Sequence, residues 1–261
     1  MTGHRSAAGP QAAVTVSVVI PVLDDAVALR HCLELLSRQS LAPLEVVVVD
    51  NGSTDDSAQV ARDFGAVVVH EPRRGIPMAA AVGYDAASGE VIARLDADSR
   101  PPRHWVARVA RAMSEESRDA VTGAGWFYDL PWPLRTPVAW IYLGAYYALC
   151  HLALGHTAVW GSSMAVRRTT WQAVSAQVHR EDPELHDDLD LAFVLGPTRR
   201  IVLDPTLGVG VSARSLRGGA QLRRRLVRAL RTLRVNWAVQ PPWLRWTERL
   251  GRALSRRRSA G

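Results

Sequence analysis

The sequence predicts an α/β fold, and three observations support that class. Short runs of β-branched residues alternate with helical patterns four times between residues 14 and 95. Several of those runs end on aspartates, at what would be the carboxyl edge of a parallel sheet. The hydrophobic content of 48% supports a large buried core and excludes a disordered chain. The 261 residues therefore fit one large α/β domain with an appendage.

The first half alternates as a right-handed parallel sheet requires. Residues 14–22 form a continuous β-branched run, which is typical of a strand buried on both faces. Leucines at helical spacing follow in residues 26–40. The alternation continues with strands at 44–50, 66–70 and 91–95 and with helices at 55–64 and 76–87. We expect a Rossmann-like half over residues 14–100.

The pattern after residue 100 is looser, and we assign residues 101–216 to a second half of the same domain. Residues 105–113 predict a helix, residues 120–128 a single strand, and residues 189–195 another helix. Cys32 and Cys150 both lie in apolar helical patterns, so we expect two buried free thiols rather than a disulfide.

One segment of this half, residues 137–160, contains no Asp, Glu or Arg. Its core, residues 138–154, approaches the ~20 residues that span a bilayer. Its Trp and Tyr side chains favour an interface, because their rings are apolar and their tips are polar. A spanning helix would separate two segments that we expect to build one site. We therefore favour an interfacial or buried helix over a span.

Positive charge is concentrated at the C-terminal end of the chain. All basic residues are arginines, and the net charge is +7. Residues 217–261 hold 13 of the arginines and one acid, Glu248, whereas residues 1–216 have an acidic excess. Such a tail fits an anionic surface, either lipid headgroups or nucleic acid.

The apolar pattern of this tail favours lipid. One helical face carries Leu222, Leu226, Leu230, Leu233 and Trp237. Basic helices with such a face lie in the membrane interface, and nucleic acid needs no such stripe. A helix packed on the domain, with solvated arginines, is the alternative. Residues 1–13 are polar, are expected to be disordered, and lack a secretory signal, so we expect a cytoplasmic chain held peripherally on the inner face of the cell membrane.

A pair of acids follows the predicted strand at 91–95. Asp96 and Asp98 stand one residue apart at the expected carboxyl edge of the sheet. Mg²⁺ and Mn²⁺ prefer oxygen ligands and usually share the phosphates of a substrate. The pattern indicates a phosphate-bearing substrate held through a divalent cation, although the same residues are also common in turns.

Four segments at strand or helix ends, residues 20–25, 49–55, 95–99 and 186–191, together carry a family resemblance. In this order and spacing they resemble the family 2 glycosyltransferases over about residues 14–216. The resemblance implies the GT-A fold, which has a Rossmann-like nucleotide-binding half and a mixed central sheet, here followed by C-terminal basic amphipathic helices. It also implies a nucleoside diphosphate sugar as the donor.

The resemblance implies roles for residues on the donor side. Pro21 and Asp24 would line the nucleotide pocket, and Asp50 would accept the N–H of the base. Arg74 and Gly75 match the family's turn under the donor. Asp98 would bind Mn²⁺ or Mg²⁺, with Asp96 on the ribose or on the metal. Arg214 is placed toward the phosphates.

The resemblance also implies roles on the acceptor side. Asp187 and Asp188 match the family's Glu-Asp motif, in which the position of Asp188 is the catalytic base. Capping of a helix is the structural alternative for these acids. Trp160 and Gly161 would border the acceptor. Gln221 and Arg224 weakly match an element of processive members.

Residues on the donor side depart from the family pattern at two places. Ala80 and Ala81 stand near the place of the usual Arg-Asn pair, and Asp24 stands in place of the usual Asn. These departures leave the sugar, the base and the acceptor unassigned.

The sequence therefore predicts an inverting, metal-dependent glycosyltransferase that acts on a lipid-linked or membrane-borne acceptor. The alternatives are a nucleotidyltransferase on a similar fold and an inactive membrane adaptor. Acids in the first loop would repel a triphosphate, and the retained Asp96, Asp98 and Asp188 argue against an inactive domain.

Overall fold

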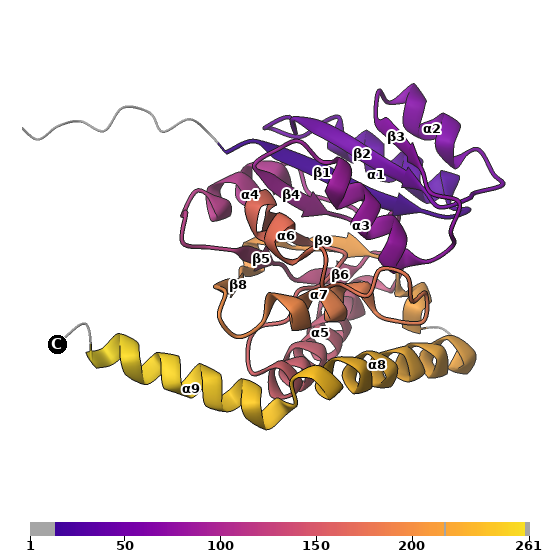
Figure 1. Ribbon diagram of the computed structural model, residues 1–261. Coiled ribbons are helices and arrows are strands. Elements are labelled where there is room, and N and C mark those ends of the chain that lie inside the picture. The colour runs from indigo at the N-terminus through magenta and orange to yellow at the C-terminus, as the bar shows by residue number, and fades with distance from the viewer. Residues whose placement is uncertain (1–13, 217, 259–261) are drawn as a thin grey trace, which may run out of the picture.

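A computed structural model describes residues 14–216 and 218–258, and the segment expected to be disordered, 1–13, lies outside them. A seven-stranded sheet in the order β3-β2-β1-β4-β7-β5-β8 forms the centre of the molecule, and β6 pairs with β9 in a second, small sheet (Figure 1). The strands are β1 (Val16–Val22), β2 (Glu45–Asp50), β3 (Val67–His70), β4 (Val91–Arg94), β5 (Ala120–Thr122), β6 (Gly125–Phe127), β7 (Met164–Arg167), β8 (Ile201–Leu203) and β9 (Val209–Val211).

The first four strands form the expected parallel half. β1 pairs in parallel with both β2 and β4, and the end of β1 at Val22 lies opposite Asp50 of β2. β7 runs antiparallel between β4 and β5, so the whole sheet is mixed. This arrangement confirms the predicted GT-A class and places the ends of β1, β2 and β4 at one edge.

Helices cover both faces of the sheet. They are α1 (Ala26–Leu36), α2 (Ser57–Asp63), α3 (Ile76–Ala86), α4 (Trp105–Met113), α5 (Trp132–Leu154), α6 (Arg168–Val174), α7 (Asp187–Leu195), α8 (Gly219–Val239) and α9 (Pro242–Arg258). Val18 and Ile20 of β1 point into one buried core, and Val19 points into the other. This alternation explains why the strand is apolar at every position. Cys32 and Cys150 are buried free thiols, as predicted.

The prediction of one strand over residues 120–128 is wrong. The chain leaves the main sheet after β5, and β6 pairs with β9 instead. The bend occurs at Gly123, where a Cβ would lie 2.3 Å from the carbonyl oxygen of Leu207. The backbone can approach Leu207 only because this residue has no side chain. The continuous apolar run therefore hides two strands of different sheets.

Most of the apolar segment expected at 137–160 belongs to α5, which begins earlier, at Trp132, and leaves residues 155–160 outside the helix. Among the helices of the described chain, α5 is the one long and apolar enough to cross a membrane, and 22% of its most apolar window is buried. It ends at Gly155, which adopts a left-handed conformation with φ of 76°. Together with α8 and α9 it forms the base of the molecule, away from α1–α3 (Figure 1).

The apolar face predicted for the tail is divided between packing and exposure. Leu233 and Trp237 of α8 pack against the core, whereas Leu226 and Leu230 are exposed. Thr232 and Asn236, both buried, hydrogen-bond to residues of the domain. The second half of α8 is therefore an integral part of the fold, and its first half presents the leucines outward.

A buried arginine of the C-terminal helix contacts the ends of two other helices. Arg245 of α9 is 3% exposed. Its guanidinium donates to the carbonyl oxygen of Leu154 at the end of α5 and to that of Phe193 in the last turn of α7. Because carbonyls at helix ends lack partners within the helix, this arginine caps two helices at once.

Candidate active site

Acidic residues gather where β1, β2 and β4 end. Asp24 and Asp25 follow β1, Asp50 ends β2, and Asp96 follows β4 closely. The side chain of Asp24 accepts hydrogen bonds from the backbone N and the hydroxyl of Thr54, at 2.7 and 3.1 Å. Asp24 therefore joins the loops that follow β1 and β2, and it does so with a positive φ of 50°.

Asp50 is nearly buried and is held as a carboxylate. It accepts from the backbone N of Ser53 at 2.9 Å, and its other oxygen lies 3.2 Å from Nδ1 of His70. Burial alone would raise the pKa of Asp50, but the hydrogen bonds from Ser53 and His70 lower it below its usual value. The carboxylate can therefore accept a hydrogen bond from a donor N–H, such as that of a base.

The turn at Arg74 and Gly75 is shaped by a residue that the sequence reasoning did not single out. Buried Asn51 donates to the carbonyl oxygens of Glu71 and Arg73 and accepts from the backbone N of Gly75 at 2.8 Å. Arg74 in turn donates to the carbonyl oxygen of Gly52. The loop after β2 and the turn before α3 therefore form one unit beside Asp50.

Asp98 shares an arginine with Asp25. Nε of Arg214 lies 3.0 Å from Asp98, and its Nη2 lies 2.5 Å from Asp25, so Arg214 reaches this edge as expected. Burial raises the pKa of Asp98 to about 6, and repulsion from Asp96 adds to the increase, while Arg214 opposes it. A cation beside Asp98 would favour the ionised form of this carboxyl.

The chemistry of this pair fits a hard divalent cation. Asp96 and Asp98 offer carboxylate oxygens one residue apart, and no group of three His, Cys, Asp or Glu side chains within the described ranges could hold a metal by itself. Mg²⁺ and Mn²⁺ commonly take one or two carboxylates and complete their shell with substrate phosphates and water. The ligand role of Asp96 and Asp98 remains a prediction.

The acceptor-side acids lie next to the donor edge. Asp187 and Asp188 begin α7, and Asp187 forms an ion pair with Arg94 of β4. Asp188 accepts from the backbone N of Gly161 at 3.0 Å. Arg94 also lies 3.1 Å from Asp96. The fold therefore joins sequence positions more than ninety residues apart, Asp96 and Asp187, through one guanidinium.

Other predicted residues fall at different distances from this centre. Trp160 is half-buried and packs against β6, where a Cβ at Gly125 would meet its ring. Pro21 is the second-last residue of β1, just before the loop that carries Asp24 and Asp25. Gln221 and Arg224 lie exposed on the first turns of α8, and Arg224 pairs with Glu184 of the loop before α7 at 3.3 Å. Their acceptor role also remains a prediction.

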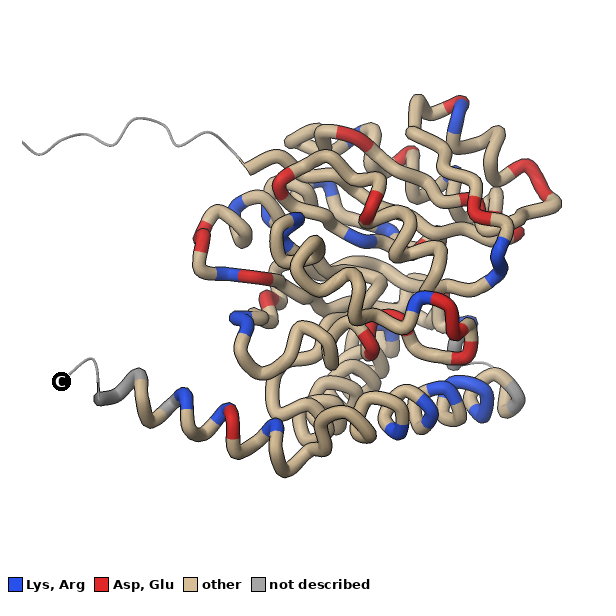
Figure 2. The backbone as a smooth tube through the Cα atoms, viewed as in Figure 1, with Lys and Arg blue, Asp and Glu red and all other residues tan. Residues whose placement is uncertain are grey.

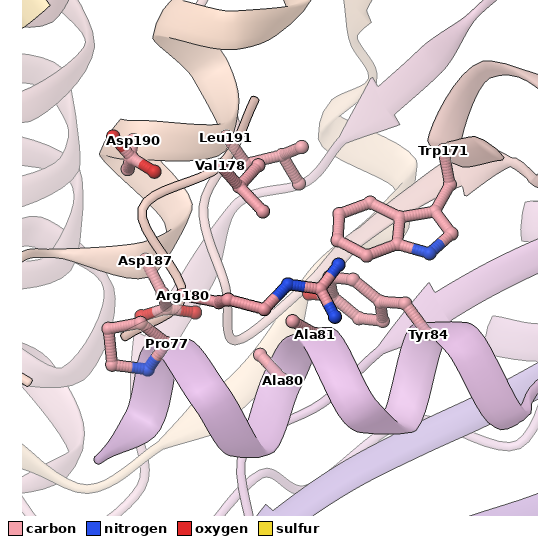
Figure 3. A pocket seen from close by; sticks show the side chains of 10 residues that line it. All are labelled: Pro77, Ala80, Ala81, Tyr84, Trp171, Val178, Arg180, Asp187, Asp190 and Leu191. Carbon is pink, nitrogen blue, oxygen red and sulfur yellow. The ribbon is translucent and has the colours of Figure 1, made fainter. Parts of the chain in front are cut away.

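The space beside Ala80 and Ala81 is filled from another element. The two alanines, Asp187 and Trp171 line a small hollow between α3, α6 and α7. Figure 3 shows the side chain of Arg180 reaching into this hollow, and its Nη1 lies 2.6 Å from Asp85. Small residues on α3 therefore make room for an arginine from the loop before α7.

Comparison with known proteins identifies the family. The model of Glycosyl transferase family 2 matches residues 17–172. Glycosyltransferase AglE of Haloferax volcanii is 33% identical over 116 residues, 41% of this chain and 38% of the relative. A PGL/p-HBAD biosynthesis glycosyltransferase of Mycobacterium bovis is 35% identical over 120 residues, 43% of this chain and 47% of the relative. The chain thus spans less than half the length of these curated relatives.

Solved structures show the same fold at low sequence identity. The mannosyltransferase PcManGT from Pyrobaculum calidifontis, in complex with GDP-Man and Mn²⁺, has a TM-score of 0.59 at 19% identity, covering 87% of this chain and 74% of its own. Glucosyl-3-phosphoglycerate synthase from Mycobacterium tuberculosis, in complex with Mn²⁺, UDP and phosphoglyceric acid, has a TM-score of 0.60 at 21% identity, with coverages of 85% and 78%. Because the family model spans more than half of the sequence, this chain belongs to Glycosyl transferase family 2.

Proposed function

We propose that this chain is an inverting, metal-dependent glycosyltransferase that moves a sugar from a nucleoside diphosphate sugar to a lipid-linked or membrane-borne acceptor. One observation carries the catalytic part of the proposal. Arg94 pairs with Asp96 of the proposed donor edge and with Asp187, which begins α7 beside Asp188, so the two groups of acids lie on either side of one guanidinium. Similar solved structures contain Mn²⁺ together with a nucleotide sugar, GDP-Man in one and UDP-Glc in another. Their contents support a nucleoside diphosphate sugar as the donor.

In this proposal Asp188 is the base. It removes the proton from the acceptor hydroxyl while that oxygen bonds to the anomeric carbon. The bond from this carbon to the diphosphate breaks, and the electron pair leaves with the phosphate oxygen. A divalent cation at Asp98 would stabilise the negative charge of the leaving diphosphate. Attack from the opposite face inverts the configuration of the sugar.

The contacts of the two acids distinguish their roles. Asp187 is committed to the guanidinium of Arg94, which neutralises its charge. Asp188 accepts hydrogen bonds from the backbone N of Gly161 and of Leu189, at 3.0 and 2.7 Å. These bonds orient the carboxylate without an ion pair, and each oxygen keeps lone-pair capacity for a proton.

A donor panel tests the catalytic proposal. The protein would be incubated with UDP- and GDP-linked hexoses and Mn²⁺ or Mg²⁺, and release of nucleoside diphosphate would be measured, with water as the default acceptor. We expect release from one donor class, dependent on the cation. No release from any donor with either cation, by a protein that is folded, would reject the proposal.

The acceptor part of the proposal rests on the base of the molecule. Large apolar side chains of three neighbouring helices are between 47% and 82% exposed. They are Trp132, Trp140, Ile141, Leu149 and Leu152 of α5, Leu222, Leu226 and Leu230 of α8, and Trp243, Leu244, Leu250 and Leu254 of α9. Exposed apolar patches of this extent mark interaction sites, and Trp and Leu beside arginines suit a lipid interface.

Charge on the same helices supports an anionic surface. Figure 2 shows arginines along α8. Arg228 and Arg231 pair with Glu184 and Asp182 at 3.0 and 2.8 Å, whereas Arg223 and Arg234 form no ion pair with the described residues. Charge therefore contributes less to the proposed membrane binding than the +12 balance of residues 217–261 suggests, and apolar contact contributes more. We place the docked protein on the cytoplasmic leaflet.

Vesicle co-sedimentation tests docking. The triple variant Leu222→Ser, Leu226→Ser, Leu230→Ser removes three half-exposed side chains, each worth about 1 kcal/mol in lipid, so affinity should fall by roughly 100-fold. Val27→Ser, at an exposed position of α1, is the control and should bind like wild type. High salt should weaken the binding without abolishing it. Equal binding to neutral and anionic vesicles would reject the contribution of charge, and binding to neither would reject docking.

A further inference from the structure

A buried arginine stands in the middle of the central sheet. Arg94 ends β4 and is 4% exposed, whereas its strand neighbours Ile92, Ala93 and Leu95 are apolar and fully buried. Removing a guanidinium from water costs several kcal/mol unless the charge is paired and hydrogen-bonded. An apolar residue would fill this strand position at no such cost. The charge at this position therefore calls for a role beyond packing.

The partners of Arg94 come from both sides of the site. Its Nη2 donates to Asp96 on the donor edge at 3.1 Å, and its Nη1 forms an ion pair with Asp187 at the start of α7. Burial alone would lower the pKa of Arg94, but Tyr84, Asp96 and Asp188 raise it above its usual value. The guanidinium therefore keeps its charge despite its burial.

The same guanidinium also lies against the loop that orients Asp188. A Cβ at Gly161 would lie 2.9 Å from Cζ of Arg94, so a side chain at this position would displace the guanidinium. The backbone N of Gly161 donates to Asp188. The hydroxyl of Ser162, the next residue, donates to Asp96 at 2.5 Å. The carboxylates of Asp96, Asp187 and Asp188 thus contact either the guanidinium of Arg94 or the neighbouring turn at residues 161–162.

We propose that Arg94 is a positioning residue that couples the donor edge to the acceptor-side acids. This inference rests on the proposed function. The planar fork of arginine can bridge two carboxylates at once, with one nitrogen on each, whereas lysine offers a single point charge. Without the fork, Asp187 and Asp96 would repel each other, and α7 would lose the contact that sets Asp188 against Gly161.

The test is a double-mutant cycle between Arg94→Met and Asp187→Asn, measured with the donor that the panel identifies. We expect each single variant to lower kcat by about 50-fold. The kcat of the double variant should lie within about 3-fold of that of Arg94→Met, because the two substitutions remove the same interaction. Affinity for the nucleoside diphosphate with Mn²⁺, measured by calorimetry, should change less than about 5-fold. Arg94→Lys should not restore kcat.

Two controls separate positioning from folding. Arg200→Met breaks an ion pair with Glu115 on the surface and should leave kcat unchanged. Thermal unfolding shows whether each variant is folded. If Arg94→Met does not fold, the cycle is run with Arg94→Lys, which keeps the charge and should show the same non-additivity with Asp187→Asn.

Three results would overturn the inference. They are multiplicative losses in the double variant, wild-type kcat in Arg94→Met or Arg94→Lys, and a loss confined to nucleotide affinity. All of these require turnover by the wild type, so they leave the proposed function intact. Absence of wild-type turnover would reject the proposed function, and the role of Arg94 with it.

Discussion

The donor edge and the helical base of this protein are built by opposite rules. At the edge, charged side chains cluster and nearly every one has a polar partner, as Asp24 has in Thr54 and Asp98 in Arg214. At the base, large apolar side chains such as Trp140 and Leu230 face outward, 66% and 65% exposed. The edge therefore offers polar groups to a ligand, whereas the base leaves apolar surface uncovered. This difference is why we propose donor chemistry at the edge and attachment at the base.

The two regions are nevertheless connected through the start of α7. Its preceding loop pairs with α8 through Glu184 and Arg228, and its first residue pairs with Arg94 of the sheet. His186 donates its backbone N–H to Thr232 of α8 at 2.9 Å. The start of α7, which carries the proposed catalytic base Asp188, therefore contacts the helical base on one side and the donor edge on the other. Variants of each region should show whether the two can be separated.

The largest effect is expected when the donor edge loses its metal ligand. Asp98→Ala should abolish Mn²⁺-dependent binding of the donor nucleotide, because the cation would keep only Asp96. Calorimetric titration with UDP or GDP and Mn²⁺ measures this. Binding to vesicles should not change, which would separate edge from base. Unchanged nucleotide affinity would show that Asp98 holds no metal.

A loss of catalysis without loss of binding is expected at Asp188. Asp188→Asn cannot take a proton, so kcat should fall by about 10²-fold or more while donor affinity stays within a few-fold of wild type. Steady-state release of nucleoside diphosphate gives kcat. If Asp190→Asn is the inactive variant instead, the base has been assigned to the wrong residue of α7.

Acid should weaken the donor edge in a defined range. Burial raises the pKa of Asp98 to about 6, so the carboxyl takes up a proton as pH falls below that value. A protonated carboxyl cannot bind a cation, and affinity for Mn²⁺ with nucleotide should fall about tenfold per pH unit below pH 6. Titrations between pH 7 and 5 measure the slope. A flat profile across this range would contradict the assignment.

The smallest effect is expected at the helical base, where burial lowers the pKa of His156 instead of raising it as at Asp98. Burial, with Arg245 nearby, lowers the pKa of His156 to about 4. The unfolded chain, with a histidine pKa of about 6.5, takes up the proton first, so stability is lost as pH falls below 6.5. We expect a loss of about 1 kcal/mol from pH 7 to pH 5.5, measured by urea unfolding. His156→Gln should reduce that slope, and an unchanged slope would argue against the buried neutral histidine.

Local patterns predicted most of the parallel half and little of what joins the halves. The β-branched runs located β1, β2 and β4 within two residues, because both faces of these strands are buried. The run at 120–128 was predicted as one strand, because nothing in its hydrophobicity marks the change of sheet at Gly123. Family motifs pointed to Asp96, Asp98 and Asp188, but the bridge at Arg94 depends on a contact between residues 93 positions apart.

The helical base shows the same limit. Helical spacing predicted the face that runs from Leu222 to Trp237, and the structure forms that helix. Spacing cannot show which part of a face packs on the domain. Leu233 and Trp237 are partly buried, whereas Leu222 stays 47% exposed, because α8 packs against the core along its second half. The pairing of Arg228 and Arg231 with acids of the loop before α7 was likewise beyond reach of the sequence.

The most direct test of the link between the two regions follows the sugar itself. Nucleotide sugars labelled in the sugar would be incubated with the protein, Mn²⁺ and vesicles of total membrane lipid, and the label would be counted in the lipid phase. We predict transfer into lipid by the wild type, about 10²-fold less transfer by Asp188→Asn, and reduced transfer by the triple serine variant of α8. Label that stays in the aqueous phase, or equal transfer by all three proteins, would contradict the proposed function.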